Sequence, residues 1–217
     1  MRKRNISHRE FFDKKSLEIF IQRIPGFKRP LKKYEQYITP SWLVAEIITE
    51  AYLRDDIKNR FIADLGCGTG RISMASAYVG AERVLCLDIS CGDLETVNIL
   101  SRELKMDHVV DVVCWDINYE IPVKVDTTIM NPPFGVYRRG YDLLFLERAF
   151  DISRRTIYSI HKYNKRSMKL IYERARRRSF EMNILGIYDM EIPAIFETHR
   201  RRVYRFKVAV VYFRRVF

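Results

Sequence analysis

Four consecutive residues, Asn131-Pro132-Pro133-Phe134, form the most specific chemical pattern in the chain, directly after the predicted strand Asp126–Met130. An exocyclic amino or amide nitrogen is a poor nucleophile, because its lone pair is delocalised into the attached π system. The side-chain oxygen of Asn131 and the carbonyl of Pro132 could accept both N–H bonds of such a nitrogen and favour a more tetrahedral transition state. Both prolines restrict the turn, so the acceptors are set in advance. The motif predicts catalysis of methyl transfer to a planar nitrogen, with Phe134 stacking on a flat substrate such as a flipped-out base.

A glycine-rich motif, Asp64-Leu65-Gly66-Cys67-Gly68-Thr69-Gly70, lies at the end of the predicted strand at residues 61–65. Glycines allow a sharp turn and a close approach of a ligand to the backbone. The dinucleotide fingerprint G-x-G-x-x-G would need a third glycine where Arg71 stands. Asp64 could accept hydrogen bonds from the amino acid end of S-adenosylmethionine. The turn therefore favours this cofactor over a dinucleotide.

Two further carboxylates follow later apolar runs. Asp88, with Ile89 after it, ends the run that begins at Arg83, about 20 residues beyond the glycine turn, where a carboxylate accepts from ribose hydroxyls. Asp116 follows the next run and could accept from an adenine amino group, with Ile117 against the ring. Each carboxylate could instead cap a helix or close a turn, and this alternative is stronger for Asp116.

The charge of the chain points to a polyanionic partner. The 39 Lys+Arg against 27 Asp+Glu give a formal net charge of +12, and neutralising phosphates releases counterions. Arg138 and Arg139 follow the catalytic motif, so we expect them to hold phosphates near the target, together with Arg200, Arg201 and Arg202 of a late turn. A solvated or heat-adapted basic surface is the alternative, and for Arg174–Arg178 the two interpretations are balanced.

The four cysteines, Cys67, Cys86, Cys91 and Cys114, form no CxxC pair and have no histidine at a zinc spacing. We therefore expect no metal site, and we expect reduced thiols, as in a cytoplasmic protein. No apolar signal core follows the charged first residues, and no segment is long enough to span a bilayer. These features predict a soluble cytoplasmic protein without a membrane partner.

Strand and helix patterns alternate from residue 61 onward, which predicts a mostly parallel sheet with helices on both faces. The last two strand patterns, Asn183–Ile192 and Arg202–Phe213, have no helix between them and predict an antiparallel C-terminal hairpin. The expected fold is α/β, the Rossmann-like class I methyltransferase fold with seven strands. We expect a single domain over residues 1–217: a basic N-terminal extension and helix at 1–33, a cofactor-covering segment and helix at 34–60, and the catalytic core at 61–217.

The motifs together resemble the methyltransferase-like 5 family of small-subunit ribosomal RNA adenine-N6 methyltransferases, from about residue 17 to the C-terminus. The shared segments are Tyr34-Glu35-Gln36-Tyr37-Ile38-Thr39-Pro40, Asp64–Gly70, Asp88, Asn131–Gly135 and Tyr158-Ser159-Ile160-His161-Lys162. The first and last of these are the most specific for the family.

The resemblance implies roles for individual residues. It places Gln36, Tyr37 and Thr39 over the cofactor, with Thr39 bonding its carboxylate, and His161 near the substrate pocket. It marks Asp64, Gly66, Asp88 and Asp116 as cofactor ligands. It also implies a partner, a small zinc-binding activator protein that covers a hydrophobic edge of the sheet. Arg71 departs from the smaller or apolar residues common after this glycine turn, and the N-terminal extension is more basic than the family core requires.

Other functions stay open at this point. A guanine-N2 methyltransferase acting on tRNA or rRNA can use the same loop, as can a protein glutamine-amide methyltransferase, although that class usually has Tyr where Phe134 stands. A non-catalytic RNA-binding subunit would not need the intact acceptor pair. We expect an RNA adenine-N6 methyltransferase that uses S-adenosylmethionine.

Overall fold

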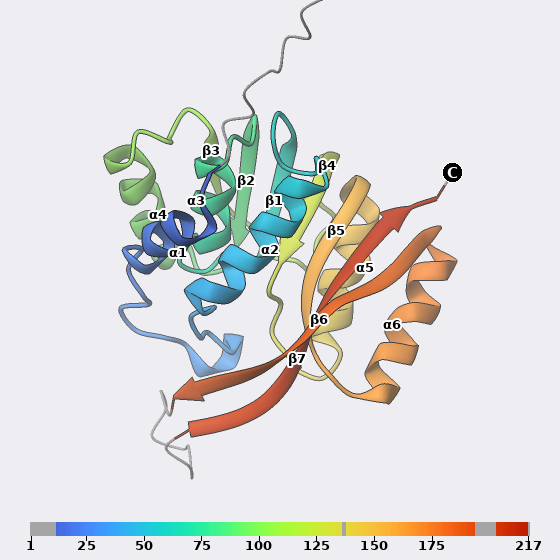
Figure 1. Cartoon of the computed structure of the whole chain (residues 1–217). Coiled ribbons are helices and arrows are strands. Elements are labelled where there is room, and N and C mark those ends of the chain that lie inside the picture. Colours follow the sequence, from blue (N-terminus) through green and yellow to red (C-terminus); the bar gives the residue numbers. More distant parts are fainter. Residues whose placement is uncertain (1–11, 136–137, 194–202, 217) are drawn as a thin grey trace, which may run out of the picture.

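The structure is a computed structural model that describes residues 12–135, 138–193 and 203–216. Helices and strands alternate through its central part, as the sequence predicts (Figure 1). The helices are α1 Lys14–Gln22, the short 3₁₀ helix η1 Lys32–Tyr34, α2 Ser41–Leu53, α3 Arg71–Tyr78, α4 Cys91–Glu103, α5 Tyr141–Ile152 and α6 Lys165–Arg177. The strands are β1 Phe61–Leu65, β2 Arg83–Asp88, β3 Val110–Cys114, β4 Val125–Met130, β5 Ser153–Lys162, β6 Phe180–Pro193 and β7 Val203–Arg215.

The strands form one seven-stranded sheet in the order β3-β2-β1-β4-β5-β7-β6. The strands from β3 to β5 pair in parallel, whereas β7 is antiparallel to both β5 and β6. The predicted parallel sheet with an antiparallel C-terminal hairpin is confirmed. The order reverses between β1 and β4, and ligands of such sheets bind beside the carboxyl ends of the strands at this reversal.

Alternating side chains on each strand divide the core into two parts. In β1, Ile62 belongs to the core covered by α1, α2, α3 and α4, while Ala63 and Leu65 belong to the core covered by α5 and α6. Successive side chains of a strand point to opposite faces, so a strand buried on both faces is apolar throughout. Helices therefore cover both faces of the sheet, as predicted (Figure 1).

The ends of some elements differ from the predicted ones. Strand β6 begins at Phe180 rather than at the predicted Asn183, and β5 begins at Ser153. Ser153 and Phe180 are buried, but Arg154, Arg155 and Glu181 beside them face solvent and interrupt the hydrophobic pattern that marks a strand. No helix within residues 12–135, 138–193 and 203–216 combines the length and apolar character needed to cross a membrane.

Candidate active site

The glycine turn links β1 to α3 and hooks onto β2. The amides of Gly66 and Cys67 both donate to the carbonyl of Leu87, at 2.8 and 3.0 Å. Gly68 has φ +53°, and a Cβ there would lie 2.8 Å from the ring of Phe27. Both the left-handed backbone and the nearby ring therefore require glycine at this position. The turn exposes backbone rather than side chains to the space above the strand ends.

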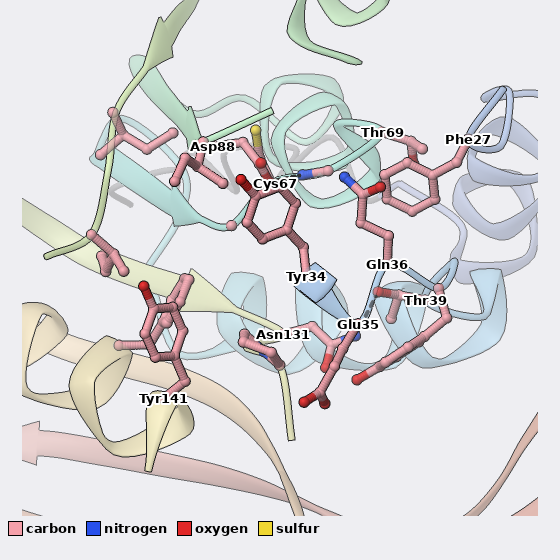
Figure 2. Close-up of a pocket in the computed structure, with 18 of the residues that line it drawn as sticks. Phe27, Tyr34, Glu35, Gln36, Thr39, Cys67, Thr69, Asp88, Asn131 and Tyr141 are labelled. Atoms are coloured by element: carbon pink, nitrogen blue, oxygen red, sulfur yellow. Dashed lines mark hydrogen bonds between the residues drawn. The ribbon is translucent and has the colours of Figure 1, made fainter. Parts of the chain in front are cut away.

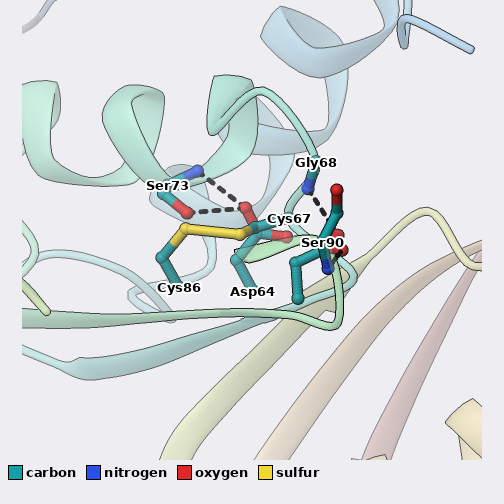
Figure 3. Close-up of a disulfide and its surroundings, with 7 residues drawn as sticks. Asp64, Cys67, Gly68, Ser73, Cys86 and Ser90 are labelled. Carbon is teal, nitrogen blue, oxygen red and sulfur yellow. Dashed lines mark hydrogen bonds between the residues drawn. A yellow bond between two sulfur atoms is a disulfide. The ribbon is translucent and has the colours of Figure 1, made fainter. Parts of the chain in front are cut away.

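Asp64 lies at the end of β1 beneath this turn and is fully buried. One carboxylate oxygen accepts from the backbone amide of Ser73 at 3.0 Å and from its hydroxyl at 2.7 Å (Figure 3). The other oxygen, Oδ1, has no hydrogen-bond partner among the residues that the structure describes. Burial raises the pKa of Asp64 to about 7, although the bonds from Ser73 oppose the shift. A buried acceptor without a donor indicates a place for a ligand that brings one.

Asp88 ends β2 and organises two neighbouring loops. Its two oxygens accept from the amides of Gly68, at 2.9 Å, and Ser90, at 2.8 Å. Burial raises its pKa above the usual aspartate value, and the backbone bonds oppose this shift. Each carboxylate oxygen retains a second lone pair. Asp88 can therefore accept from a ligand hydroxyl without releasing the glycine turn.

Asp116 follows β3, where it closes a turn and also lines the pocket. Its Oδ1 accepts from the backbone and side-chain nitrogens of Asn118, at 2.9 and 2.8 Å, which closes a local turn. Asp116 nevertheless lines the same pocket as Asp88, beside Ile117 and Trp115. The indole nitrogen of Trp115 is buried and has no partner within the described part of the chain.

The segment from Tyr34 to Pro40 covers one side of the pocket (Figure 2). Gln36 is buried, accepts from the amide of Leu31 at 2.7 Å and donates to Asp93 of α4 at 2.8 Å. Gln36 therefore anchors the segment. The guanidinium of Arg71 donates to the carbonyl of Thr39 at 3.0 Å and to that of Ile24 at 3.2 Å. The residue that departs from the family pattern thus braces the covering segment against the glycine turn.

Asn131 follows β4, the strand next to β1, and contacts the covering segment. Its Nδ2 donates to the hydroxyl of Thr39 at 2.9 Å. In this orientation of the amide the hydroxyl of Thr39 acts as the acceptor. The same orientation leaves Oδ1 as a buried acceptor with no partner among the described residues. The Thr39 hydroxyl accepts this bond and keeps its own O–H, so its donation to a cofactor carboxylate stays a prediction.

One pocket unites most of the predicted cofactor residues (Figure 2). Of the predicted set, its lining includes Gln36, Tyr37, Thr39, Gly66, Gly68, Asp88, Ile89, Asp116, Ile117 and Asn131. Asp64 and Gly70 lie outside the lining, beneath the turn. Sequence reasoning did not assign Phe27, Tyr34, Trp115, Tyr141 or Phe145 to the site, although all of them line the pocket. Only Tyr34 had a signal, since it begins the family-specific segment.

Of the three residues that follow Asn131 in the motif, Pro133 lines the pocket, whereas Pro132 and Phe134 do not. Pro132 is buried and does not line the pocket. The ring of Phe134 stacks on Tyr37, with centroids 5.4 Å apart, and meets the edge of Phe206 at 5.3 Å. Phe134 therefore fixes the loop against the covering segment and β7. Its stacking on a substrate stays a prediction.

The predicted RNA-contacting residues divide into three groups. Arg138 lines the pocket, where its guanidinium donates to the Tyr141 hydroxyl at 2.9 Å, and Arg139 is exposed. His161 is 1% exposed, is absent from the pocket lining and bonds Ser159 at 2.9 Å. Burial lowers the pKa of His161 to about 4, so it is neutral and has no surface for RNA. Arg200, Arg201 and Arg202 lie outside the described residues.

The cysteines correct a prediction. Two disulfides, Cys67–Cys86 (Figure 3) and Cys91–Cys114, replace the expected reduced thiols, and the described residues include no free cysteine. The sequence separations of 19 and 23 residues show no CxxC pattern. Parallel pairing nevertheless aligns the ends of β1, β2 and β3, which brings the Cα atoms to 5.7 and 5.2 Å. Both disulfides brace loops around the pocket.

Comparison with known proteins identifies the family. Residues 43–155 match the family described as "Methyltransferase small domain". The chain is 32% identical over 192 residues to the rRNA N(6)-adenosine-methyltransferase METTL5 of Danio rerio, covering 87% of this chain and 92% of that protein. The Drosophila melanogaster protein of the same name is 31% identical over 87% of this chain and 90% of that protein. The chain belongs to the METTL5 family of methyltransferases.

A solved structure agrees with this assignment. Protein PH1948 from Pyrococcus horikoshii superposes with a TM-score of 0.87 at 33% identity, covering 95% of this chain and 100% of that one. The fold is thus that of a class I methyltransferase, a class that in general uses S-adenosylmethionine.

Removal of the exposed Cys91–Cys114 disulfide should destabilise this methyltransferase. In the chain-entropy account, a cross-link closing a loop of this length is worth about 3 kcal/mol of unfolding free energy. We expect Cys91→Ser/Cys114→Ser to lower the free energy of unfolding by about that amount in denaturant titrations without reductant.

With reductant present, wild type and the double variant should unfold at nearly the same denaturant concentration. Thiol titration of unreduced, denatured wild type provides the direct control. Reaction of all the cysteines in that sample would contradict both disulfides.

Proposed function

We propose that this methyltransferase transfers a methyl group from S-adenosylmethionine to the N6 amino group of an adenosine in small-subunit ribosomal RNA. The observation that carries the proposal is the buried Oδ1 of Asn131, a fixed acceptor without a partner among the described residues, at the wall of the pocket. The names of the Danio rerio and Drosophila melanogaster relatives, both rRNA N(6)-adenosine-methyltransferases, support adenosine N6 in rRNA as the target. The proposal that the substrate is small-subunit rRNA rests on the family resemblance of the sequence.

The pocket fits S-adenosylmethionine by the chemistry of its donors and acceptors. Asp64 is buried beneath the glycine turn and outside the pocket lining, so the ammonium of the amino acid end would reach its unpartnered Oδ1 through a bridging water. Asp88 has lone pairs left for ribose hydroxyls, and Asp116 could accept from the adenine amino group while Ile117 packs on the ring. The bound cofactor would supply a methyl group on a positively charged sulfonium.

The chain's own residues position and activate the target nitrogen. The Asn131 Oδ1 accepts one N–H bond of the amino group, and the carbonyl of Pro132 accepts the other. Each bond draws electron density toward the nitrogen and opposes its delocalisation into the ring, which favours attack on the methyl carbon. The C–N bond would form as the sulfonium S–C bond breaks, so the positive charge would pass from sulfur to nitrogen and a neutral thioether would be released. One proton would then leave the nitrogen to water. No strong base is required, consistent with the burial of His161 away from the pocket.

Arg138 and Arg139 are the proposed contacts to RNA phosphates beside the pocket. Arg138 lies above two aromatic rings, with its guanidinium carbon 5.8 Å from the Tyr34 centroid and 5.0 Å from the Tyr141 centroid. Such stacking orients the planar guanidinium and leaves other N–H bonds for phosphate oxygens. Phe134 remains the proposed stacking partner of the target base.

A small zinc-binding activator protein is the proposed partner, and this proposal rests on the family resemblance. Strands β3 and β6 form the two edges of the sheet. Unpaired backbone groups at an edge can pair with a strand of another chain. Among the described residues no group of three or more His, Cys, Asp or Glu could hold a metal. The zinc would therefore belong to the partner.

The decisive test of the proposed function uses labelled S-adenosylmethionine and unmodified small-subunit rRNA, with and without the activator. We expect label in N6-methyladenosine after digestion to nucleosides. Asn131→Ala should lower kcat by about a hundredfold or more, because it removes an acceptor that acts at the transition state. Calorimetry should show cofactor affinity largely retained. Label in N2-methylguanosine or only in protein would refute the proposal.

Thr39 should act as a positioning residue for Asn131. Thr39→Val removes the hydroxyl that holds Nδ2 but keeps the branched shape, so the amide can rotate and misplace Oδ1. We expect kcat to fall about tenfold while KM for the cofactor changes little. Thr39→Ser restores the hydroxyl and should restore most of kcat. If Ser and Val variants lose activity equally, the hydrogen bond has no such role.

Cofactor binding should depend on the ionisation of Asp64. Its folded-state pKa near 7 lies above the usual aspartate value, so the carboxyl is increasingly protonated below neutral pH. A bound ammonium favours the ionised form, and binding therefore weakens as the pH falls. We expect the affinity for S-adenosylhomocysteine to drop roughly tenfold between about pH 7.5 and 5.5. Asp64→Asn should bind more weakly and lose this dependence. A flat wild-type profile would contradict the role.

A further inference from the structure

The helix α6 carries far more positive charge than its own stability requires. Residues 165–178 contain seven Lys and Arg and a single acid, Glu173. Cations in the last turn suit the helix dipole, but Lys165 and Arg166 occupy the first turn, which holds no acidic residue. Positive charge is unfavourable there, because the dipole is positive at the amino end. The positive charge of these two residues therefore does not stabilise α6 and indicates an interaction outside the helix.

The cations of α6 fall into two groups. Arg174 pairs with Glu147 of α5 at 2.7 Å, and Arg178, just after the helix, pairs with Glu147 and Asp151. These arginines flank the face formed by Met168, Ile171 and Ala175, which is buried in the core. They tie α6 to α5. Ion pairing within the protein accounts for this group.

The second group faces solvent and is unpaired within the described part of the chain. It comprises Lys165, Arg166, Lys169, Arg176 and Arg177, all exposed and none in a salt bridge with a described residue. Tyr172 lies among them and is 47% exposed. Along the helix it is one turn from both Lys169 and Arg176. We call Lys165, Arg166, Lys169, Tyr172, Arg176 and Arg177 the α6 cationic face.

The α6 cationic face continues from the catalytic loop. Phe134 of that loop contacts Phe206, and the ammonium of Lys162 lies 5.7 Å from the Phe206 centroid. Lys162 ends β5, three residues before α6 begins. Strand β5 is parallel to β4, so its carboxyl end shares the sheet edge that bears the pocket. From there α6 extends about 20 Å along the flank of the sheet (Figure 1).

We propose that the α6 cationic face binds the sugar-phosphate backbone of the substrate RNA beyond the target nucleotide. Unpaired cations spaced about one helical turn apart match a polyanion, and an aromatic ring between them can stack on an unpaired base. A merely solvated helix would carry both signs of charge and gain nothing from an exposed Tyr172. The proposal rests on RNA being the substrate. It adds a second contact surface that holds RNA outside the pocket.

The test compares two triple variants of equal charge in the full-length protein. Lys165→Gln/Lys169→Gln/Arg176→Gln removes three cations from the proposed surface. Lys58→Gln/Arg102→Gln/Lys105→Gln removes three exposed cations near the opposite, amino-end edge of the sheet. The dissociation constant for a small-subunit rRNA transcript is measured over a series of salt concentrations, without cofactor. S-adenosylhomocysteine affinity and thermal unfolding show that both variants remain folded.

We expect the α6 triple variant to bind RNA roughly tenfold or more weakly near physiological salt, with the log–log salt slope smaller by about 2. The opposite-edge variant should bind like wild type. Tyr172→Ala should weaken binding, and Tyr172→Phe should retain it, because stacking needs only the ring. Equal losses in both triple variants would mean a nonspecific charge effect and would overturn the proposal, as would unchanged binding. Methylation of guanine instead of adenine would refute the proposed activity while leaving this surface intact.

Discussion

The hydrogen bond from Asn131 to the hydroxyl of Thr39 joins the two parts of the molecule that must meet for the pocket to exist. Asn131 follows the strand β4 of the parallel sheet, while Thr39 belongs to a segment that precedes the sheet in sequence. Arg71 fixes the carbonyl of the same threonine from the glycine turn. Thr39 is therefore held from two sides. Its position determines both the orientation of the Asn131 amide and the closure of the pocket.

The rest of the N-terminal region supports this contact. Arg71 also holds the carbonyl of Ile24, and Gln36 ties the covering segment to α4 through Asp93. Burial lowers the pKa of the Arg71 guanidinium from its ordinary value, yet arginine stays charged in proteins. Two carbonyl acceptors offset part of the desolvation that this charge suffers. An apolar residue after the glycine turn would pack there but could not connect these segments.

The sequence was sufficient to predict the fold, because strand and helix periods and the hydrophobic runs are local properties. It also predicted that the glycine turn, Asp88 and Asn131 lie at one edge of the sheet, because the carboxyl ends of parallel strands share that edge. Contacts between distant side chains could not be predicted in this way. The pairing of Thr39 with Asn131, the stacking of Phe134 on Tyr37 and both disulfides depend on how segments lie in space.

His161 shows a second limit of sequence reasoning. A conspicuous motif around it suggested a place near the substrate, but the strand period turns its side chain into the sheet interior, where it bonds Ser159. The family-specific pattern is then explained by burial rather than by RNA contact. Motifs mark positions under constraint and do not state which constraint applies.

Charges of opposite sign lie at different places around the carboxyl-end edge of the sheet, with aspartates at the pocket and exposed cations around it. Asp64 and Asp88 end adjacent strands, and burial raises the pKa of both. Such carboxylates are costly to ionise unless a cation or several donors reach them. Lys33, Arg71 and Arg138 line the pocket, whereas the unpaired cations of Arg139 and of α6 lie outside it. A ligand with a cationic end therefore suits the pocket interior, whereas a polyanion suits its surroundings. In the proposed reaction, this separation would keep the two substrates in different places before their reacting atoms meet at Asn131.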